Sequence, residues 1–202
     1  MEQQVLLEGV RDNFPFTLLK GYLNPQQQQA LLKEAQSYPF TRPIVQVFGQ
    51  SHVIPRSQAW FGDLGCHYFY SGLFIEALPW PKYAHKLRVM LHRDFGFISN
   101  GVLVNHYVDG TQSMGWHSDD EPEIVSGSDI ASLTLGASRD FFLRHKETLE
   151  KVKLTLDSGD LLLMHWPMQQ SWQHSLPKRM GVHKPRVNYT FRSLSPHYHN
   201  AK

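Results

Sequence analysis

The stretch PRVNYTFR, residues 185–192, indicates the fold of this chain more clearly than any other. Its even-numbered positions from 186 to 192 are polar, and the positions between them are apolar. Because alternate side chains of a strand point to opposite faces, the pattern predicts a strand with one polar and one apolar face. The polar face is either exposed to water or a cradle for a dicarboxylate, since guanidinium groups pair bidentately with carboxylates. That face carries Arg186, Asn188, Thr190 and Arg192.

The sequence around this strand predicts many further short strands and few helices. Strand patterns occur in VQVFG (45–49), HYFYSG (67–72), GVLVNHYVDG (101–110), ASLTLG (131–136) and RDFFLRHK (139–146). KVKLTLDSGDLLLMHW (151–166) predicts a hairpin that turns at residues 157–159. One helix is expected over 24–37, capped by Asn24 and Gln27, and another over 82–94, ended by Gly96. This balance predicts a mainly β protein, an antiparallel barrel or double-sheet jelly roll with helices packed outside.

The composition is that of an ordinary soluble globular protein, with 202 residues, 41% hydrophobic residues and a single cysteine. This length predicts one domain, and no run approaches the roughly 20 apolar residues that a membrane span needs. The N-terminal residues lack the apolar core of a signal peptide, so we expect the cytoplasm, or the nucleus in a eukaryote. Residues 161–202 contain no Asp or Glu, and Lys178, Arg179 and Lys184 there are candidate phosphate contacts.

A second stretch, GWHSDDEPE at residues 115–123, gathers one histidine and four carboxylates. His117 and Asp119 are two apart, so in an extended segment they point to the same side. Two imidazoles, one carboxylate and open positions suit non-haem iron(II), and the best third candidate is His174 in WQHSLP. The alternative is an acidic loop in solvent. Asn105 and Tyr107 in NHYVDG share one strand face and are candidates to complete the cradle.

Taken in order, NHYVDG (105–110), HSD (117–119), WQHSLP (172–177) and RVNYTFR (186–192) resemble the signature of the AlkB family of iron(II)- and 2-oxoglutarate-dependent nucleic-acid dealkylases. The resemblance covers about residues 45–194 and is strongest toward the branch of AlkB homologue 2, which repairs duplex DNA. It implies one domain with the double-stranded β-helix (jelly-roll) oxygenase fold. Helices and nucleotide-recognition hairpins would occupy about residues 1–95, and the catalytic core about residues 96–195.

The resemblance also implies a reaction and a set of ligands. An N-methyl group on a base such as 1-methyladenine or 3-methylcytosine would be oxidised and released as formaldehyde, while 2-oxoglutarate and O2 give succinate and CO2. His117, Asp119 and His174 would bind Fe(II). Arg186 would bind the 2-oxoglutarate carboxylate near the metal, and Arg192 would pair with the far carboxylate. The remaining co-substrate contacts would be Asn105, Tyr107, Asn188 and Thr190.

On the substrate side, the resemblance implies that Val47, Phe48 and Gly49 form a finger that stacks into the duplex when the damaged base flips out. The alternative for Phe48 is a core aromatic. Gln50 departs from the branch, in which a lysine is expected, and this removes a possible phosphate contact. The residues implied to line the base pocket are Tyr68, Tyr70, Ser71, Asp120 and Glu121, with core packing as the alternative for the two tyrosines.

Several assignments stay open at the level of sequence. Glu123 is expected to be solvated, and Arg56 and Arg139 are either nucleic-acid backbone contacts or members of structural ion pairs. The expected partner is alkylated DNA, or RNA, with no membrane, and the chain is expected to act as a monomer. Two rival functions are a 2-oxoglutarate oxygenase acting on RNA, a protein or a small molecule, and a non-catalytic nucleic-acid-binding module.

Overall fold

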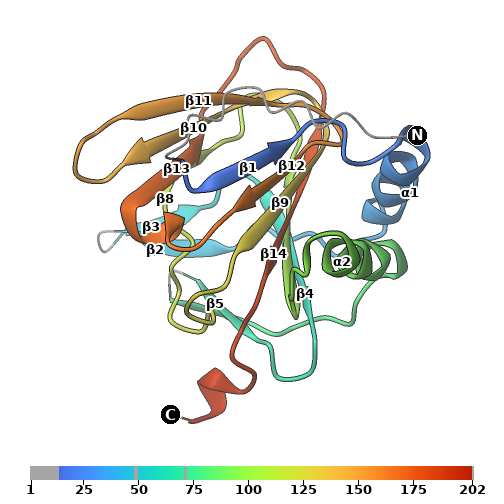
Figure 1. Cartoon of the computed structure of the whole chain (residues 1–202), viewed down its shortest axis with the longest axis vertical. Helices are drawn as coiled ribbons and strands as arrows, with labels where there is room; N and C mark the ends of the chain where they lie inside the picture. The colour runs from blue at the N-terminus through green and yellow to red at the C-terminus, as the bar shows by residue number, and fades with distance from the viewer. Residues whose placement is uncertain (1–13, 48–49, 71, 202) are drawn as a thin grey trace.

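The computed structural model describes residues 14–47, 50–70 and 72–201, which form two antiparallel sheets packed face to face (Figure 1). The larger sheet has the strand order β1 (Phe16–Leu19), β12 (Leu161–Met164), β9 (Ile130–Gly136), β14 (Arg186–Arg192), β7 (Gly101–Tyr107) and β4 (Ser57–Gly62). The smaller sheet has the order β11 (Lys151–Leu156), β10 (Arg139–His145), β13 (Trp172–Leu176) and β8 (Met114–His117). This arrangement confirms the predicted double-sheet jelly roll.

Two hairpins and four helical segments complete the described chain. The hairpins pair β2 (Ile44–Val47) with β3 (Gln50–Val53), and β5 (Tyr68–Tyr70) with β6 (Leu73–Ile75). The helical segments are α1 (Pro25–Ala35), α2 (Lys82–Phe95), α3 (Met168–Ser171) and the 3-10 helix η1 (Tyr198–Ala201). None of the helices in the described ranges is long and apolar enough to cross a membrane.

The start of α1 and the end of α2 lie where their capping residues predict. The Asn24 side chain accepts a hydrogen bond from the Gln27 N–H, and the Gln27 side chain accepts one from the Asn24 N–H, which is a complete capping box. Gly96 ends α2 with a φ of +65°, a left-handed conformation that glycine adopts without strain. The helix boundaries predicted from sequence are therefore confirmed to within one turn.

Strand β14 lies inside the larger sheet, between β9 and β7, and all seven of its residues are buried. Its apolar face, which includes Tyr189 and Phe191, joins a core cluster with Leu87 and Leu91 of α2, and Figure 1 shows both long helices on this side of the sheet. Its polar face points toward the smaller sheet. The interpretation in which this polar face is in water is therefore wrong, and the cradle for a dicarboxylate stays a prediction for a face that is buried.

The predicted hairpin over residues 151–166 is wrong. Strand β11 pairs with β10 in the smaller sheet, whereas β12 pairs with β1 and β9 in the larger one. Residues 157–159 therefore carry the chain from one sheet to the other. Gly159 has a φ of +93°, and its N–H donates to the Thr134 carbonyl oxygen rather than closing a two-residue turn. Turn-forming residues serve a crossing between sheets as well as a hairpin.

The larger sheet draws strands from both sides of residue 95. Strands β1 and β4 precede that point, and the other four follow it. The split into a recognition part and a catalytic part therefore stays a prediction, with the qualification that the first part contributes both edge strands of the larger sheet.

Candidate active site

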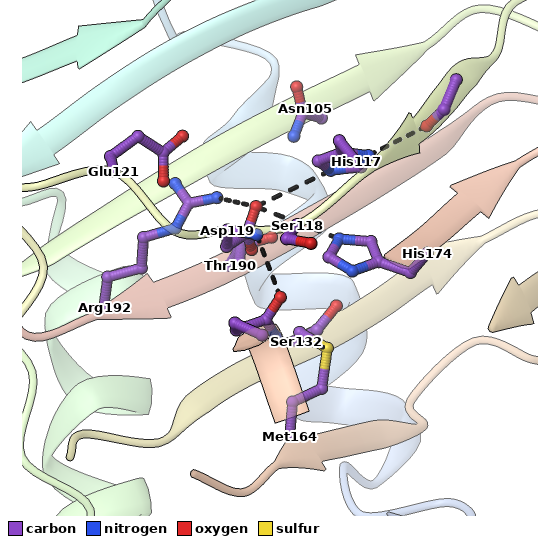
Figure 2. A network of polar contacts seen from close by, with 12 residues as sticks. Asn105, His117, Ser118, Asp119, Glu121, Ser132, Met164, His174, Thr190 and Arg192 are labelled. Atoms are coloured by element: carbon purple, nitrogen blue, oxygen red, sulfur yellow. Dashed lines mark hydrogen bonds and ion pairs between the residues drawn. The ribbon is translucent and has the colours of Figure 1, made fainter. Parts of the chain in front are cut away.

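Three potential metal ligands meet where the smaller sheet ends. His117 is the last residue of β8 and pairs across the sheet with His174 of β13, so that the two ring centroids are 4.1 Å apart. Asp119 follows two residues later, with its Oδ1 3.6 Å from His117 Nε2 and 3.9 Å from His174 Nε2. The ligand atoms of the three residues all lie within 4.8 Å of one another (Figure 2). The geometry therefore fits one metal ion.

Neighbouring groups fix the orientation of each ligand. His117 Nδ1 lies 2.9 Å from the Gly115 carbonyl oxygen, so Nδ1 carries the proton and Nε2 is left to bind a metal. The Asp119 N–H donates to Gln169 Oε1 at 2.9 Å. The Phe141 ring stacks on the His174 ring at 5.4 Å. The set of donors and their preset orientation therefore suit a divalent metal of the iron group.

The electrostatics of the three groups hold them in metal-binding form. Burial lowers the pKa of His174 to about 3 and also lowers the pKa of His117, so both imidazoles are held neutral. Burial alone would raise the pKa of Asp119, but the Arg192 guanidinium beside it holds the pKa well below its ordinary value. Two neutral imidazoles and one carboxylate are thus ready for a cation without prior loss of protons.

The two arginines of β14 take different places. Arg192 Nη2 lies 2.9 Å from Asp119 Oδ1, which puts this guanidinium at the metal end of the cavity. Arg186 lies at the other end of the strand, where its Nη2 donates to Thr134 Oγ1 at 2.9 Å and its guanidinium packs over the Tyr107 ring. The ends assigned to the two arginines from sequence are therefore reversed: Arg192 is beside the metal site and Arg186 is remote from it.

One cavity brings together all nine residues expected to hold metal and co-substrate. Asn105, Tyr107, His117, Asp119, His174, Arg186, Asn188, Thr190 and Arg192 all line it. Arg186 is 2% exposed and burial lowers its pKa to about 10, yet no carboxylate of the described chain pairs with it. Nε of Arg186 and both Nε and Nη1 of Arg192 have no hydrogen-bond partner among the described groups. Buried guanidinium groups with unsatisfied nitrogens at both ends of one cavity fit a molecule with two carboxylates.

Further polar side chains, which the sequence did not predict, support these residues. Thr134 and Ser132 of β9 lie opposite Asn188 and Thr190 in the sheet register, and Asn188 Nδ2 donates to Ser132 Oγ at 2.9 Å. The alternation in ASLTLG was the available signal, since Ser132 and Thr134 share one face. Nothing near Gln169 in the sequence marks it as the partner of Asp119, because it lies 50 residues away along the chain.

Arg56 and Arg139 are both buried, and neither forms an ion pair within the described ranges. Arg56 Nε donates to Asn105 Oδ1 at 2.9 Å, which orients a residue of the co-substrate cavity. Arg139 donates to three backbone carbonyl oxygens, those of Asp109, Gln112 and Pro177. Both expected roles, nucleic-acid backbone contact and structural ion pair, are therefore wrong for these two buried arginines.

On the substrate side, Tyr68 and Glu121 lie together beside the cavity. The Tyr68 hydroxyl donates to Glu121 Oε1, and its ring lies 5.1 Å from the Arg192 guanidinium. Burial raises the pKa of Glu121 to about 7, although Arg192 acts in the opposite direction. Phe48, Gly49 and Ser71 lie outside the described residues, as do the side chains of Val47 and Tyr70, so the roles expected for these five residues stay predictions.

Two neighbouring acids differ from what the sequence predicts. Asp120, expected at the base pocket, has a side chain that is 65% exposed, and its Oδ2 lies 3.9 Å from Lys146 Nζ. Glu123, expected in solvent, is completely buried. Among the candidate phosphate contacts, Lys178 and Lys184 are exposed, but Arg179 is engaged with Asp140 at 2.6 Å. The acidic stretch therefore turns inward at Asp119, Glu121 and Glu123 and outward at Asp120.

Comparison with known proteins agrees with this geometry. The sequence model of the 2OG-Fe(II) oxygenase superfamily matches residues 15–192. DNA oxidative demethylase ALKBH2 of Bos taurus is 42% identical over 96% of this chain and 72% of its own length. The chain belongs to the AlkB family. The Mus musculus ALKBH2 is 46% identical over 75% of this chain and 67% of its own length. Alkb homolog 3 of Mus musculus is 40% identical over 70% of this chain and 52% of its own length.

A solved structure supports the fold of this AlkB family member. OsALKBH1 superimposes with a TM-score of 0.62 over 92% of this chain and the whole of that one, at 15% sequence identity. Membership of the family, together with the His117, Asp119 and His174 group, identifies the chain as an Fe(II)- and 2-oxoglutarate-dependent dioxygenase.

Proposed function

We propose that this AlkB family member is a DNA repair enzyme that removes N-methyl and other small alkyl groups from damaged bases by oxidation. The observation that carries the proposal is the identity of 42–46% to proteins named DNA oxidative demethylase in cattle, mouse and human. The site supports the proposal, because one cavity holds the metal-ligand group and the two buried arginines of β14, and a hydrogen-bonding pair, Tyr68 and Glu121, lies beside it.

We propose that His117, Asp119 and His174 hold Fe(II) and that the two arginines of β14 hold 2-oxoglutarate. When bound, iron and 2-oxoglutarate supply the oxidation of a methyl group by O2, with succinate and CO2 as products. Arg192 keeps Asp119 ionised and lies where a carboxylate near the metal would bind. Arg186 would pair with the far carboxylate, and Asn105, Tyr107, Asn188 and Thr190 line the space between. Guanidinium groups orient a dicarboxylate because each can donate two parallel hydrogen bonds.

The proposed base site lies on the Tyr68 and Glu121 side of the metal ligands. Bases such as 1-methyladenine and 3-methylcytosine are cationic, and the Glu121 carboxylate can accept a hydrogen bond from their exocyclic amine. Tyr68 stacks on Trp60 at 4.8 Å and is buried, so its hydroxyl holds Glu121 in a fixed place. A base must leave the duplex to reach this depth, which costs a few kcal/mol and less for a lesion that cannot pair.

The remaining parts of the proposal concern the nucleic acid itself. Phe48, which lies between β2 and β3 in the sequence, is proposed as the residue that fills the gap in the duplex. The exposed Lys178 and Lys184 are proposed phosphate contacts. Every group named above comes from one chain, so a monomer suffices. We expect the enzyme in the compartment that holds the DNA, the cytoplasm of a prokaryote or the nucleus of a eukaryote.

The test compares duplex DNA, single-stranded DNA and RNA, each carrying one 1-methyladenine, and measures formaldehyde release with Fe(II), 2-oxoglutarate and O2. We expect release from DNA, none from the His117→Ala variant, and weaker binding of the duplex by Phe48→Ala. Release from RNA alone would move the substrate class to RNA. No release from any methylated strand, with normal 2-oxoglutarate turnover, would favour a protein or small-molecule substrate.

A further inference from the structure

The loop that follows Asp119 is fastened to the segment that follows β14. The Val125 N–H donates to the Ser193 carbonyl oxygen at 2.9 Å, and the Ser195 N–H donates to the Glu123 carbonyl oxygen at 2.8 Å. These bonds form a short ladder between two segments that are far apart in the sequence. Figure 1 shows the chain running on from β14 to η1, away from the two sheets.

A buried carboxylate lies at the centre of this junction. The Glu123 side chain is completely buried, and its Oε1 accepts a hydrogen bond from the Phe69 N–H of β5 at 2.7 Å. Its other oxygen, Oε2, has no hydrogen-bond partner among the described groups. The nearest basic group is His199, whose Nε2 lies 3.3 Å from Oε1 and whose side chain is 16% exposed. A buried carboxylate is costly without a partner, and among the described side chains His199, whose Nε2 has no hydrogen-bond partner of its own, is placed to supply one.

The segment that follows β14 also packs against the β5–β6 hairpin. The His199 ring packs against Phe69 at 5.6 Å and against Phe74 at 6.1 Å, and so touches both strands. The His197 N–H donates to the Gly65 carbonyl oxygen at 2.8 Å, just before β5 begins. Gly65 has a φ of +81°, and a Cβ there would come within 2.4 Å of the His197 ring. The segment is therefore packed closely against the hairpin.

This hairpin carries part of the proposed base site. Tyr68 precedes Phe69 directly, and its hydroxyl donates to Glu121, two residues after the metal ligand Asp119. The position of the Phe69 N–H, which Glu123 fixes, therefore determines where the Tyr68 ring and hydroxyl lie. Glu123 thus links His199 to the groups proposed to hold the damaged base.

We propose that His199 is a positioning residue for demethylation: it compensates Glu123, and so holds β5 and the Tyr68–Glu121 pair in place beside the metal cavity. This proposal rests on the proposed function, because it assigns the pair to the base. It concerns how the base is presented to the metal, and it predicts no change in the binding of metal or 2-oxoglutarate.

The first experiment compares the wild type with His199→Phe, which keeps the ring packing and removes the basic nitrogen, and with His92→Phe, the same change at an exposed position of α2. Formaldehyde and succinate are both measured on methylated duplex DNA. We expect formaldehyde per succinate to fall at least about fivefold in His199→Phe only, since misplacing a positioning group can cost up to about 100-fold. Succinate formation without DNA should match the wild type. An unchanged ratio would overturn the proposal.

A second measurement separates this proposal from the proposed function. Amide hydrogen exchange at Phe69 reports the hairpin directly and needs no substrate. We expect the exchange rate of the Phe69 amide to rise about tenfold in His199→Phe, because Glu123, which accepts its hydrogen bond, loses the compensation from His199. The rate should stay unchanged in His92→Phe. Equal exchange in all three proteins would overturn the proposal even if demethylation occurs. A wild type that releases no formaldehyde would instead overturn the proposed function.

Two further variants guard against simple loss of folding. In a Glu123→Gln background no charge needs compensation, so His199→Phe should cause little additional loss of the formaldehyde-to-succinate ratio. His199→Gln, which restores an N–H donor near Oε1, should recover part of the ratio in the otherwise wild-type protein. A full loss from His199→Phe in the Glu123→Gln background would show that the loss does not come from an uncompensated carboxylate and would overturn the compensating role.

Discussion

Nη2 of Arg192 lies 2.9 Å from Oδ1 of Asp119, and both side chains are buried almost completely. In the absence of metal this guanidinium is the positive charge nearest the carboxylate, and it keeps the pKa of Asp119 well below its ordinary value against the effect of burial. The same guanidinium has two nitrogens without partners that are available to a carboxylate of the co-substrate. Arg192 therefore links the metal ligand to the co-substrate site.

We first predict that Arg192→Met destabilises the metal-free protein by about 3–5 kcal/mol, because Asp119 is left as a buried charge without a partner. Denaturant unfolding without metal measures the change. Mn(II), which replaces the lost positive charge, should raise the melting temperature of the variant more than that of the wild type. Adding Asp119→Asn to the variant should recover part of the lost stability. A variant as stable as the wild type would contradict the compensating role of Arg192.

We next predict that metal binding depends little on pH between 5.5 and 7.5. Burial lowers the pKa of His174 to about 3, so this imidazole has no proton to lose in this range, and burial also lowers the pKa of His117, so fewer protons are lost there than from an exposed histidine. Two exposed histidines with the usual pKa of about 6.5 would instead weaken binding about 100-fold on going from pH 7.5 to 5.5. Titration with Mn(II) at several pH values measures this. A loss of affinity close to that of exposed histidines would contradict the burial argument.

A third prediction concerns Glu121. Burial raises its pKa to about 7, above the value of roughly 4.3 of an unfolded chain, so the folded state favours the protonated acid. The stability from this group is fully present below about pH 4 and is lost as the pH rises through 7. The free energy of unfolding of metal-free Glu121→Gln, relative to that of the wild type, should therefore rise by about 3 kcal/mol from pH 4 to pH 8. Unfolding free energies of both proteins across this range give the difference. A difference that does not vary with pH would exclude a raised pKa.

Much of the site was predictable because strand periodicity acts locally. The alternation in residues 185–192 predicts which side chains of β14 share a face, and the spacing of His117 and Asp119 predicts that they point the same way. The third ligand, His174, was the best candidate among the histidines from its place in the sequence, and the resemblance to a family then supported that choice. The capping box at Asn24 and the glycine stop at Gly96 are also local, and both helices follow them.

The errors share one cause, which is that they depend on how distant segments meet. The way β14 faces β8 across the cavity decides which of its arginines lies near the metal. The sequence of a single strand does not reveal this arrangement. Glu123 is buried because His199 and Phe69, from distant parts of the chain, lie against it. The crossing at residues 157–159 has the same turn chemistry as a hairpin and differs only in its pairing partners.

Our last prediction is that replacing Arg186 has the opposite effect on stability from replacing Arg192. Arg186 is buried without a carboxylate partner, and burial lowers its pKa to about 10, so its charge is a cost to the protein without co-substrate. Arg186→Met, which fills similar space, should leave the stability of the 2-oxoglutarate-free protein unchanged or higher. It should also raise the KM for 2-oxoglutarate about 100-fold or more, because the far carboxylate loses its charged partner.

Thermal unfolding with and without 2-oxoglutarate tests both halves of this prediction. The wild type should gain stability from the co-substrate, and Arg186→Met should gain almost none. Arg186→Lys is the matched control: it keeps the charge but loses the fork of donors, so its KM should lie between the two. A strongly destabilised Arg186→Met protein would mean that the arginine serves the fold, and an unchanged KM would mean that the co-substrate binds elsewhere. The opposite signs expected at the two ends of β14 follow from one difference: Arg192 has a carboxylate of its own chain beside it, and Arg186 has none among the residues that the structure describes.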